Sequence, residues 1–418
     1  MEPSASSAPN APNGQTAPGP ATTTTTSATP GGNRPTLAVP KETAANERRV
    51  ALIPDAVKKY TGSGLTVLVQ AGAGEGSFFS DDAYTQAGAK IVPDAATLYG
   101  QGDLILKVQK PEPREIDQMK PGATLIAFLQ PMVNLDLVRQ LVQRRITAFS
   151  MDAIPRTTRA QYMDALSSMA TVAGYKAVLL AADHTAKFFP LLTTAAGTIP
   201  PAKVLIIGAG VAGLMAIGTA RRLGAVVEAY DARAVVKEQV ESLGAKFVVI
   251  DTGADLAGAG GYAKEATEDI LSKQQAGLGA RAAKSDIVIT TAAVPGRPAP
   301  RLIPASTVEQ MAPGSVIVDL AAETGGNCEL TVPGEIVERH GVTIIGITNL
   351  PSTLPVHASQ MYSKNIQNLL ALMIGKDGTF NIDMNDDILN QTIITQDGQI
   401  LHQGTQARLN PAPIAAAS

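Results

Sequence analysis

The sequence predicts an α/β fold with doubly wound parallel sheets in two domains. Short apolar runs that fit buried parallel strands alternate with segments of helical pattern along most of the chain. This alternation is typical of a parallel sheet with helices on both faces. A length of 418 residues is enough for two or three domains.

The segment 203–233, KVLIIGAGVAGLMAIGTARRLGAVVEAYDAR, organises the rest of the chain. An apolar run at 204–207 is followed by closely spaced glycines, a helical pattern over 212–223 and a second apolar run at 225–230. A strand, a helix and a second strand in this order are the context that a glycine-rich nucleotide motif requires.

The glycines of this segment have the spacing G-x-G-x-x-G. Gly208 permits a tight turn, Gly210 lets a pyrophosphate approach the backbone, and Gly213 lets the helix pack on the strand. Phosphates would sit on the N–H groups at the positive end of the helix dipole. The pattern predicts a Rossmann-type dinucleotide site; the alternative is a glycine-rich turn in another α/β fold.

Asp231 ends the second apolar run, eighteen residues after Gly213. A carboxylate at this place can accept hydrogen bonds from both ribose hydroxyls, and it repels a 2′-phosphate. We therefore expect NAD(H) rather than NADP(H), although Arg233, two residues later, argues in the other direction.

The composition excludes several classes of function. A net charge of −3 gives no electrostatic case for nucleic-acid binding. A single cysteine, Cys328, excludes a disulfide framework and a cysteine zinc cluster, and suits a reducing cytoplasm. We expect no metal site. We expect no secretory signal, because the N-terminus has no basic region followed by an apolar core. We expect no membrane span, because the longest apolar run, 204–220, is short and interrupted by glycines.

Four segments follow from these patterns. Residues 1–35 are a low-complexity tail that we expect to be disordered, and 406–418 are expected to fray. We expect two Rossmann-like domains with a cleft between them: a discontinuous first domain of 36–166 plus 352–405, and an NAD(H)-binding domain at 167–351. The expected strands lie at 36–40, 65–70, 104–108, 124–129, 147–150, 204–207, 225–230, 247–250, 286–290, 315–320 and 343–347.

Residues 151–168, MDAIPRTTRAQYMDALSS, interrupt the alternation. On a helix starting near Thr158, the side chains of Gln161, Asp164 and Ser167 would share one face. One interpretation is the capped, solvated first turn of a long helix at 163–182. The other is a functional loop.

Two further loops could serve a nucleotide. The glycine-rich segment 252–275 has the length of a lid, and Gly260 and Gly261 could act as hinges for Tyr262. The loop 291–300 follows the carboxyl end of a strand, where ligands bind in open α/β sheets.

The sequence offers no obvious acid–base group beside the predicted nucleotide site. A dehydrogenase that acts on an alcohol or an amine needs a proton acceptor near the hydride donor. Of the four histidines, only His357, at the start of a predicted helix over 357–374, could reach a cleft.

Several motifs together resemble the NAD(H)-binding alpha subunit, domain I, of proton-translocating NAD(P) transhydrogenases, in the form in which this domain is a separate polypeptide. The resemblance covers about residues 36–400 and is carried by VPKE…NERRVALIP, IPRTTRAQYMDALSS, GAGVAGL, DARAVVKEQVESLGAKF, GGYAKE, VPGRPAP and DLAAETGGNCE. The sister family is alanine dehydrogenase.

The resemblance implies hydride transfer between NADH on this chain and NADP+ on a partner, without a general base. It implies a homodimer, an NADP(H)-binding beta subunit and a membrane-spanning subunit, and attachment to the cytoplasmic face of the inner membrane through these partners. It also implies that Gln161 sits between the two nicotinamide rings and that Tyr262 lies on a closing loop. The implied catalytic residues are Arg156, Gln161, Asp164 and Ser167, and the implied cofactor-binding residues are Arg156, Thr157, Thr158, Arg159, Gln161, Ser167, Gly208, Gly210, Val211, Ala212, Gly213, Asp231, Ala232, Arg233, Gly261, Tyr262, Ala292 and Ala293.

Two other functions stay open at this point. An alanine dehydrogenase-like oxidoreductase would retain Arg49, but Gln109 and Gln130 stand where that family has a lysine and a histidine, and glutamine cannot exchange the required proton. A non-catalytic NAD sensor is the third hypothesis.

Overall fold

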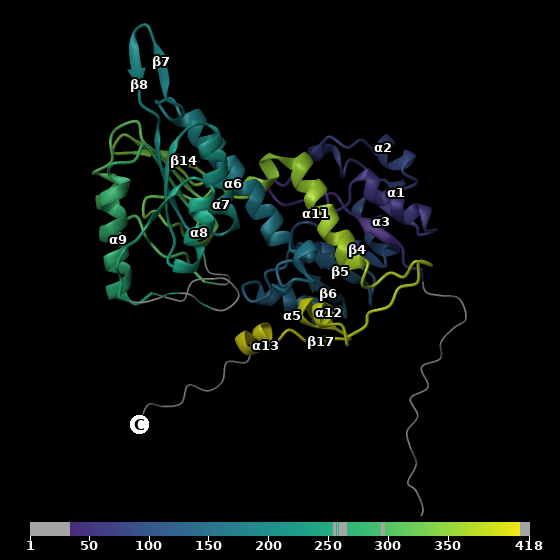
Figure 1. Cartoon of the computed structure of the whole chain (residues 1–418). Coiled ribbons are helices and arrows are strands. Elements are labelled where there is room, and N and C mark those ends of the chain that lie inside the picture. The colour runs from purple at the N-terminus through teal and green to yellow at the C-terminus, as the bar shows by residue number, and fades with distance from the viewer. Residues whose placement is uncertain (1–33, 254–255, 257, 259–265, 294–296, 410–418) are drawn as a thin grey trace, which may run out of the picture.

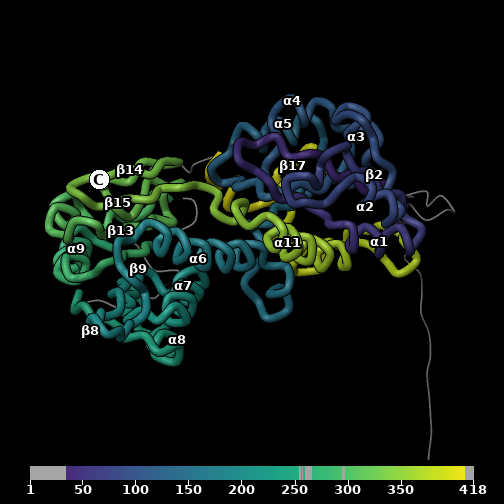
Figure 2. The backbone as a smooth tube through the Cα atoms, turned by 90° about the horizontal axis from the view of Figure 1, so that it is seen from above, coloured from purple at the N-terminus to yellow at the C-terminus, as the bar shows by residue number. Residues whose placement is uncertain are grey.

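The computed structural model describes residues 34–253, 256, 258, 266–293 and 297–409. Two groups of elements, each built around a largely parallel sheet, are connected by the long helix α6 (Figures 1 and 2). The fold class is therefore α/β with two Rossmann-like sheets, as the sequence predicts.

The first sheet has the strand order β17-β16-β6-β5-β4-β1-β2-β3. The run from β6 to β3 in this order is parallel, whereas β16 pairs antiparallel with β6 and β17 antiparallel with β16. The strands span Leu37–Val39 (β1), Val67–Gln70 (β2), Lys90–Val92 (β3), Leu104–Leu106 (β4), Thr124–Ala127 (β5), Thr147–Ser150 (β6), Ile393–Gln396 (β16) and Gln399–Ile400 (β17).

Alternate residues of these strands enter two different cores. Leu37 and Val39 of β1 belong to a core with residues of helices α1 (Pro54–Gly62) and α11 (Pro355–Leu370). Ala38 belongs to a core with residues of α3 (Ala95–Gln101), α4 (Pro113–Gln118) and α5 (Leu135–Gln143). A strand that is apolar on both faces is what a doubly wound sheet requires.

The second sheet has the order β11-β10-β9-β12-β13-β15-β14, in which only the pairing of β14 with β15 is antiparallel among the described strands. The chain leaves β9 toward β10 and β11 on one side, and continues from β12 toward β13 on the other. The carboxyl ends of β9 and β12 thus form the switch point at which open α/β sheets bind ligands. The strands span Lys203–Ile207 (β9), Val226–Tyr230 (β10), Lys246–Val248 (β11), Ile287–Thr290 (β12), Val316–Asp319 (β13), Ile336–Arg339 (β14) and Val342–Ile345 (β15).

Helix α6, Ala165–His184, belongs to both groups. Met169 and Val172 near its start pack in the first core, and Ala177 and Val178 pack in the core of the second sheet. Within the described residues, α6 alone is long and apolar enough to cross a membrane, but core helices meet the same criteria. The other helices of four or more residues span Pro54–Gly62 (α1), Asp81–Gln86 (α2), Ala95–Gln101 (α3), Pro113–Gln118 (α4), Leu135–Gln143 (α5), Val211–Arg222 (α7), Lys237–Ser242 (α8), Glu268–Ala282 (α9), Ala305–Val308 (α10), Leu350–Thr353 (η6, a 3-10 helix), Pro355–Leu370 (α11), Asp387–Thr392 (α12) and Gln403–Leu409 (α13).

Several local expectations were wrong. No helix starts near Thr158: a turn leads into the 3-10 helix η2, Gln161–Met163, and α6 begins only at Ala165. The end of the predicted loop 252–275 is helical, because Thr267 caps α9 with its side chain. The sequence patterns also did not predict β3, β14, or the hairpin β7–β8 (Leu192–Thr194 and Gly197–Ile199), which projects from the second sheet (Figure 1).

Candidate nucleotide site

The glycine turn after β9 has the geometry that the motif predicts. Gly208 has a φ of 97°, a conformation that side chains rarely adopt, and its N–H donates to the carbonyl of Tyr230 over 2.8 Å. The hydroxyl of Thr291 donates to the Gly208 carbonyl over 3.0 Å. The turn is therefore held by the ends of the two neighbouring strands, β10 and β12.

The other two glycines of the motif have opposite surroundings. A Cβ on Gly213 would lie 1.9 Å from the Gly208 carbonyl oxygen, so the helix can approach the turn only with glycine there. A Cβ on Gly210 would have no atom within 4 Å. Gly213 thus serves packing, and Gly210 leaves open space for a ligand.

Helix α7 presents its N-terminus at this turn. Gly210 is the N-cap, and the first backbone bond along the helix is that from the Leu214 N–H to the Gly210 carbonyl, 2.8 Å. The N–H groups of Val211, Ala212 and Gly213 precede that bond and have no acceptor within the helix. Open space beside N–H groups that have no acceptor within the helix, at the positive end of its dipole, fits a pyrophosphate.

Asp231 lies directly after β10 and is 8% exposed. Its Oδ2 accepts from the N–H of Ala209 over 2.7 Å, which ties it to the glycine turn. Arg233 binds the same carboxylate through its backbone and its guanidinium. Asp231 therefore lies beside the glycine turn, where the sequence predicts a ribose acceptor, and Arg233 is bound to its carboxylate. Ala232, between these two residues, is partly buried.

The loop after β12 completes the switch point. The N–H of Ala292 donates to Oδ1 of Asn327 over 3.0 Å, and the amide of Asn327 donates back to the Ala292 carbonyl over 2.8 Å. Asn327 is fully buried. Ala293 follows with an exposed side chain. Sequence reasoning missed Asn327, although it lies in the quoted segment DLAAETGGNCE.

A close helix crossing connects the two halves of the predicted site. A Cβ on Gly174 of α6 would lie 2.1 Å from the carbonyl oxygen of Ala212 in the first turn of α7. Ser167 precedes Gly174 by seven residues on the same helix, which corresponds to roughly 10 Å along the axis. Helix α6 therefore carries its own first turn to a fixed distance from the glycine turn. Sequence reasoning did not single out Gly174.

The structure brings Asp164 and Ser167 into contact at the start of α6. Asp164 accepts from the Ser167 N–H over 2.9 Å and from the Ser167 hydroxyl over 2.5 Å, and so caps the helix. The interpretation as a capped first turn is thus correct for this pair. It does not exclude a second role, because both side chains remain partly exposed.

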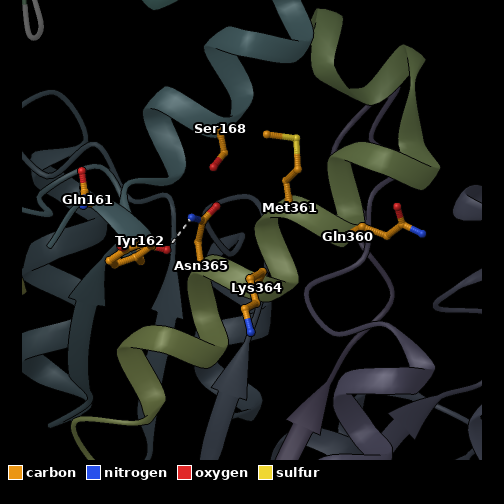
Figure 3. A pocket seen from close by; sticks show the side chains of 7 residues that line it. All are labelled: Gln161, Tyr162, Ser168, Gln360, Met361, Lys364 and Asn365. Atoms are coloured by element: carbon orange, nitrogen blue, oxygen red, sulfur yellow. Dashed lines mark hydrogen bonds between the residues drawn. The ribbon is translucent and has the colours of Figure 1, made fainter.

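Gln161 lies on the rim of a hollow between η2, the start of α6 and α11 (Figure 3). The hollow has a volume of about 400 Å³. The amide of Asn365 donates to the Tyr162 carbonyl over 3.0 Å and fixes this segment of the loop to α11. The residues that line the hollow are Gln161, Tyr162, Ser168, Gln360, Met361, Lys364 and Asn365.

The remaining candidate residues have different surroundings. Arg156, Thr157 and Thr158 are exposed in the segment before η2. Arg159 instead binds Asp386 over 2.8 Å and also contacts Asp387, so its guanidinium ties the loop to the start of α12. Gly261 and Tyr262 lie outside the described residues. His357, considered as a base, is exposed in the first turn of α11.

Comparison with known proteins agrees with this geometry. The model of the alanine dehydrogenase/PNT N-terminal domain matches residues 38–173, and that of the C-terminal domain matches residues 177–403. The chain belongs to the alanine dehydrogenase/PNT family. An NAD(P) transhydrogenase subunit alpha polypeptide of Rhodospirillum rubrum is 48% identical over 374 residues, which are 88% of this chain and 97% of that protein.

Within the family, this chain stands with the transhydrogenase alpha subunits. The crystal structure of a transhydrogenase from Sinorhizobium meliloti matches with a TM-score of 0.79 and 43% identity, over 87% of this chain and 99% of the other. An L-alanine dehydrogenase structure matches with a TM-score of 0.73 and 29% identity, over 90% of this chain and 99% of the other. The alanine dehydrogenase of Bacillus subtilis is likewise 29% identical, over 88% of this chain and 93% of that protein.

Two of the residues compared with alanine dehydrogenase, Arg49 and Gln109, meet at one largely buried carboxylate, that of Glu47. Arg49, 3% exposed, makes a bidentate ion pair with Glu47, with bonds of 2.8 and 2.5 Å. Gln109 donates to the same carboxylate over 2.8 Å, and Asn349 donates to it over 3.0 Å. Burial alone would raise the pKa of Glu47, but the hydrogen bond and charge of Arg49 outweigh it and lower the pKa to about 2. Among these bonds of the described residues, none involves Gln130.

Proposed function

We propose that this chain is the NAD(H)-binding subunit of a proton-translocating NAD(P) transhydrogenase. Hydride passes directly between NADH on this chain and NADP+ on a beta subunit, and protons move through separate membrane-spanning subunits. The close similarity to transhydrogenase alpha subunits supports this proposal, together with the nucleotide site at the switch point of the second sheet.

The observation that carries the proposal is the glycine turn. A positive φ at Gly208, open space at Gly210 and a backbone approach that only glycine allows at Gly213 occur together at one helix N-terminus. These features would cradle a pyrophosphate on the amides of Val211 and Ala212, with Asp231 placed for the ribose. The predicted NAD(H) fits the residues present.

The first turn of α6 and the loop before it would hold the nicotinamide end. A bound NADH supplies the hydride, and a transfer between two ring carbons needs no proton acceptor from the protein. Gln161 and Arg156, both exposed, would orient the ring toward the partner, while Asp164 and Ser167 fix the turn that places them. Positioning of this kind can lower a barrier by roughly 7–11 kcal/mol at best.

The assembly belongs to the same proposal. We propose a homodimer, bound peripherally to the cytoplasmic face of the inner membrane through a membrane-spanning subunit. We further propose the division into residues 36–166 plus 352–405 and residues 167–351. The pairing of β16 with β6 supports it, because it places a C-terminal strand in the first sheet.

Adding a beta subunit to this chain tests the proposal. With NADH and the thionicotinamide analogue of NADP+, we expect reduction of the analogue that depends on both proteins. Gln161→Ala should lower the rate at saturating NADH by about tenfold or more, with little change in NADH affinity. If the chain bound NADH but transferred hydride to no NADP+ analogue, the hypothesis of a non-catalytic NAD sensor would be favoured instead.

Amino-acid oxidation is tested in the same preparation. L-alanine with NAD+ should give no NADH, because Gln109 and Gln130 cannot take up the proton and Arg49 is bound to Glu47. Stoichiometric NADH formation from alanine would establish that the chain is an alanine dehydrogenase-like oxidoreductase.

A further inference from the structure

The Asp231 carboxylate is saturated by donors from the protein. Its Oδ1 accepts from the backbone N–H of Arg233 and from Arg233 Nε, each over 2.8 Å. Its Oδ2 accepts from the Ala209 N–H over 2.7 Å and from Arg233 Nη2 over 2.8 Å. Two oxygens offer about four acceptor positions, and all four are taken.

A ribose diol must therefore replace some of these donors. The two backbone donors belong to the glycine turn and to the chain after β10, so they stay where the fold holds them. The other two donors, Nε and Nη2 of Arg233, are on a side chain, which can leave the carboxylate by rotating about its own bonds. A 2′,3′-diol would exchange two charge-assisted bonds from Arg233 for two bonds from hydroxyls.

The Arg233 guanidinium also changes how strongly the site repels a 2′-phosphate. A lone carboxylate at this position excludes the phosphate by repulsion, which is the basis for expecting NAD(H). With Arg233 bound to it, the pair carries no net charge, and a guanidinium that turns away from Asp231 is a bidentate donor for phosphate oxygens. The side chains of Arg233 and Asp231 are 14% and 6% exposed, so solvent screens this effect only weakly.

We infer that Arg233 is a specificity-determining residue of this site: it competes with the ribose of NAD(H) for Asp231 and reduces the exclusion of 2′-phosphorylated nucleotides. The inference rests on the proposed function, because it requires that a dinucleotide binds at the glycine turn. It adds that discrimination between NADH and NADPH is set by the Asp231–Arg233 pair, and not by Asp231 alone.

Fluorescence titration of the full chain with NADH and with NADPH tests the inference. For Arg233→Ala we expect the ratio of the NADPH and NADH dissociation constants to rise by about tenfold or more, through weaker NADPH binding and unchanged or tighter NADH binding. Arg233→Lys keeps the charge and should give an intermediate ratio. Asp231→Asn removes the opposing charge, and the ratio should fall below that of the unmodified chain.

Arg222→Ala, in the last turn of α7, is the matched control and should leave the ratio unchanged, because this exposed arginine lies outside the pair. AMP and adenosine 2′,5′-bisphosphate repeat the comparison without the nicotinamide end. An unchanged ratio in Arg233→Ala, or an equal loss of both nucleotides in a variant with unaltered thermal unfolding, would overturn the inference. If the unmodified chain binds neither nucleotide, the proposed function fails instead. If Arg233→Ala does not fold, Arg233→Lys decides: a ratio equal to that of the unmodified chain would overturn the inference.

Discussion

Gly210 and Gly213 are three residues apart in one motif, but the structure gives them different tasks. We expect Gly213→Ala to cost about 1–3 kcal/mol of stability, because its Cβ would lie 1.9 Å from the Gly208 carbonyl oxygen and α7 must shift. Gly210→Ala should keep the thermal unfolding temperature of the unmodified chain and still lose NADH affinity, because the methyl group would occupy open space beside the helix N-terminus. Thermal unfolding and NADH titration of both variants check this.

Each glycine variant is the control for the other. If Gly210→Ala bound NADH with unchanged affinity, the pyrophosphate could not lie on this turn. If Gly213→Ala were as stable as the unmodified chain, the close approach of α7 to the turn would be wrong.

The Glu47–Arg49 pair gives a prediction for acid stability. The folded chain holds the pKa of Glu47 at about 2, below its ordinary value of 4.5. The stabilisation from the ionised carboxylate is therefore complete above about pH 4.5, and it is lost as the pH falls toward about 2. Glu47→Gln leaves the buried Arg49 without its counter-charge, and we expect a loss of roughly 3–5 kcal/mol at neutral pH.

Urea unfolding at a series of pH values measures this difference. The gap between the unmodified chain and Glu47→Gln should narrow as the pH falls below about 4.5, because glutamine does not titrate. Glu75→Gln is the matched control: Glu75 pairs with Lys41 on the surface, and exposed pairs contribute at most about 1 kcal/mol. If the difference in the free energy of unfolding between the two proteins stayed constant across the pH range, the lowered pKa of Glu47 would be wrong.

Among the elements, the start of α6 combines a structural and a proposed catalytic role. Asp164→Ala should lower stability by about 1 kcal/mol, because the cap on the Ser167 N–H is lost. Asp164→Asn keeps a good N-cap residue, so stability should be retained. Under the proposed function, Asp164→Asn should still lower the rate of hydride transfer, because asparagine lacks the negative charge that accepts the Ser167 hydroxyl and so holds this side chain less firmly. Full activity in a stable Asp164→Asn variant would show that Asp164 acts only as the N-cap of α6.

The crossing of α6 over α7 is the second prediction at this scale. Gly174→Ala would bring a Cβ to 2.1 Å from the Ala212 carbonyl oxygen, so the two helices must separate. We expect lower stability and weaker NADH binding, since Ala212 is in the turn that would hold the pyrophosphate. Gly218→Ala on α7 meets nothing within 4 Å and should raise stability by about 0.5–1 kcal/mol. If Gly174→Ala and Gly218→Ala had the same stability and the same NADH affinity, α6 and α7 could not cross as closely as the structure shows.

Local sequence signals predicted the elements of the proposed nucleotide site, but they did not predict residues whose contacts are with distant parts of the chain. The turn at Gly208 follows from three glycines between apolar runs, because only glycine tolerates that φ and that approach. Nothing local marks Gly174 or Asn327, since each is defined by a partner on another element. The saturation of Asp231 by Arg233 could be suspected from their spacing, but only the structure gives all four bonds.

At the scale of the whole molecule, the C-terminal segment belongs to the first sheet. The sequence after residue 381 is polar, with short β-like pieces. The structure places β16 antiparallel to β6, with Ile393 opposite Phe149. Ile393 and Ile394 are fully buried, one in each of the two cores of this sheet. A short strand that pairs with a much earlier segment of the chain leaves no periodic signal strong enough to predict the pairing.

Two truncations test how far the fold depends on this segment. A chain that ends at residue 409 keeps all of α13 and should unfold at the same temperature as the full chain and bind NADH equally. A chain that ends at residue 385 loses α12, β16, β17 and α13, and with them the buried side chains of Ile388, Leu389, Ile393 and Ile394. At about 1.5–3 kcal/mol for each buried side chain, this loss is comparable to the roughly 5–15 kcal/mol that stabilise a domain. The shorter chain also exposes the edge of β6, which invites aggregation. We therefore expect it to be insoluble or unfolded by circular dichroism, whereas a soluble, NADH-binding chain ending at 385 would show that the first sheet is stable without its C-terminal strands.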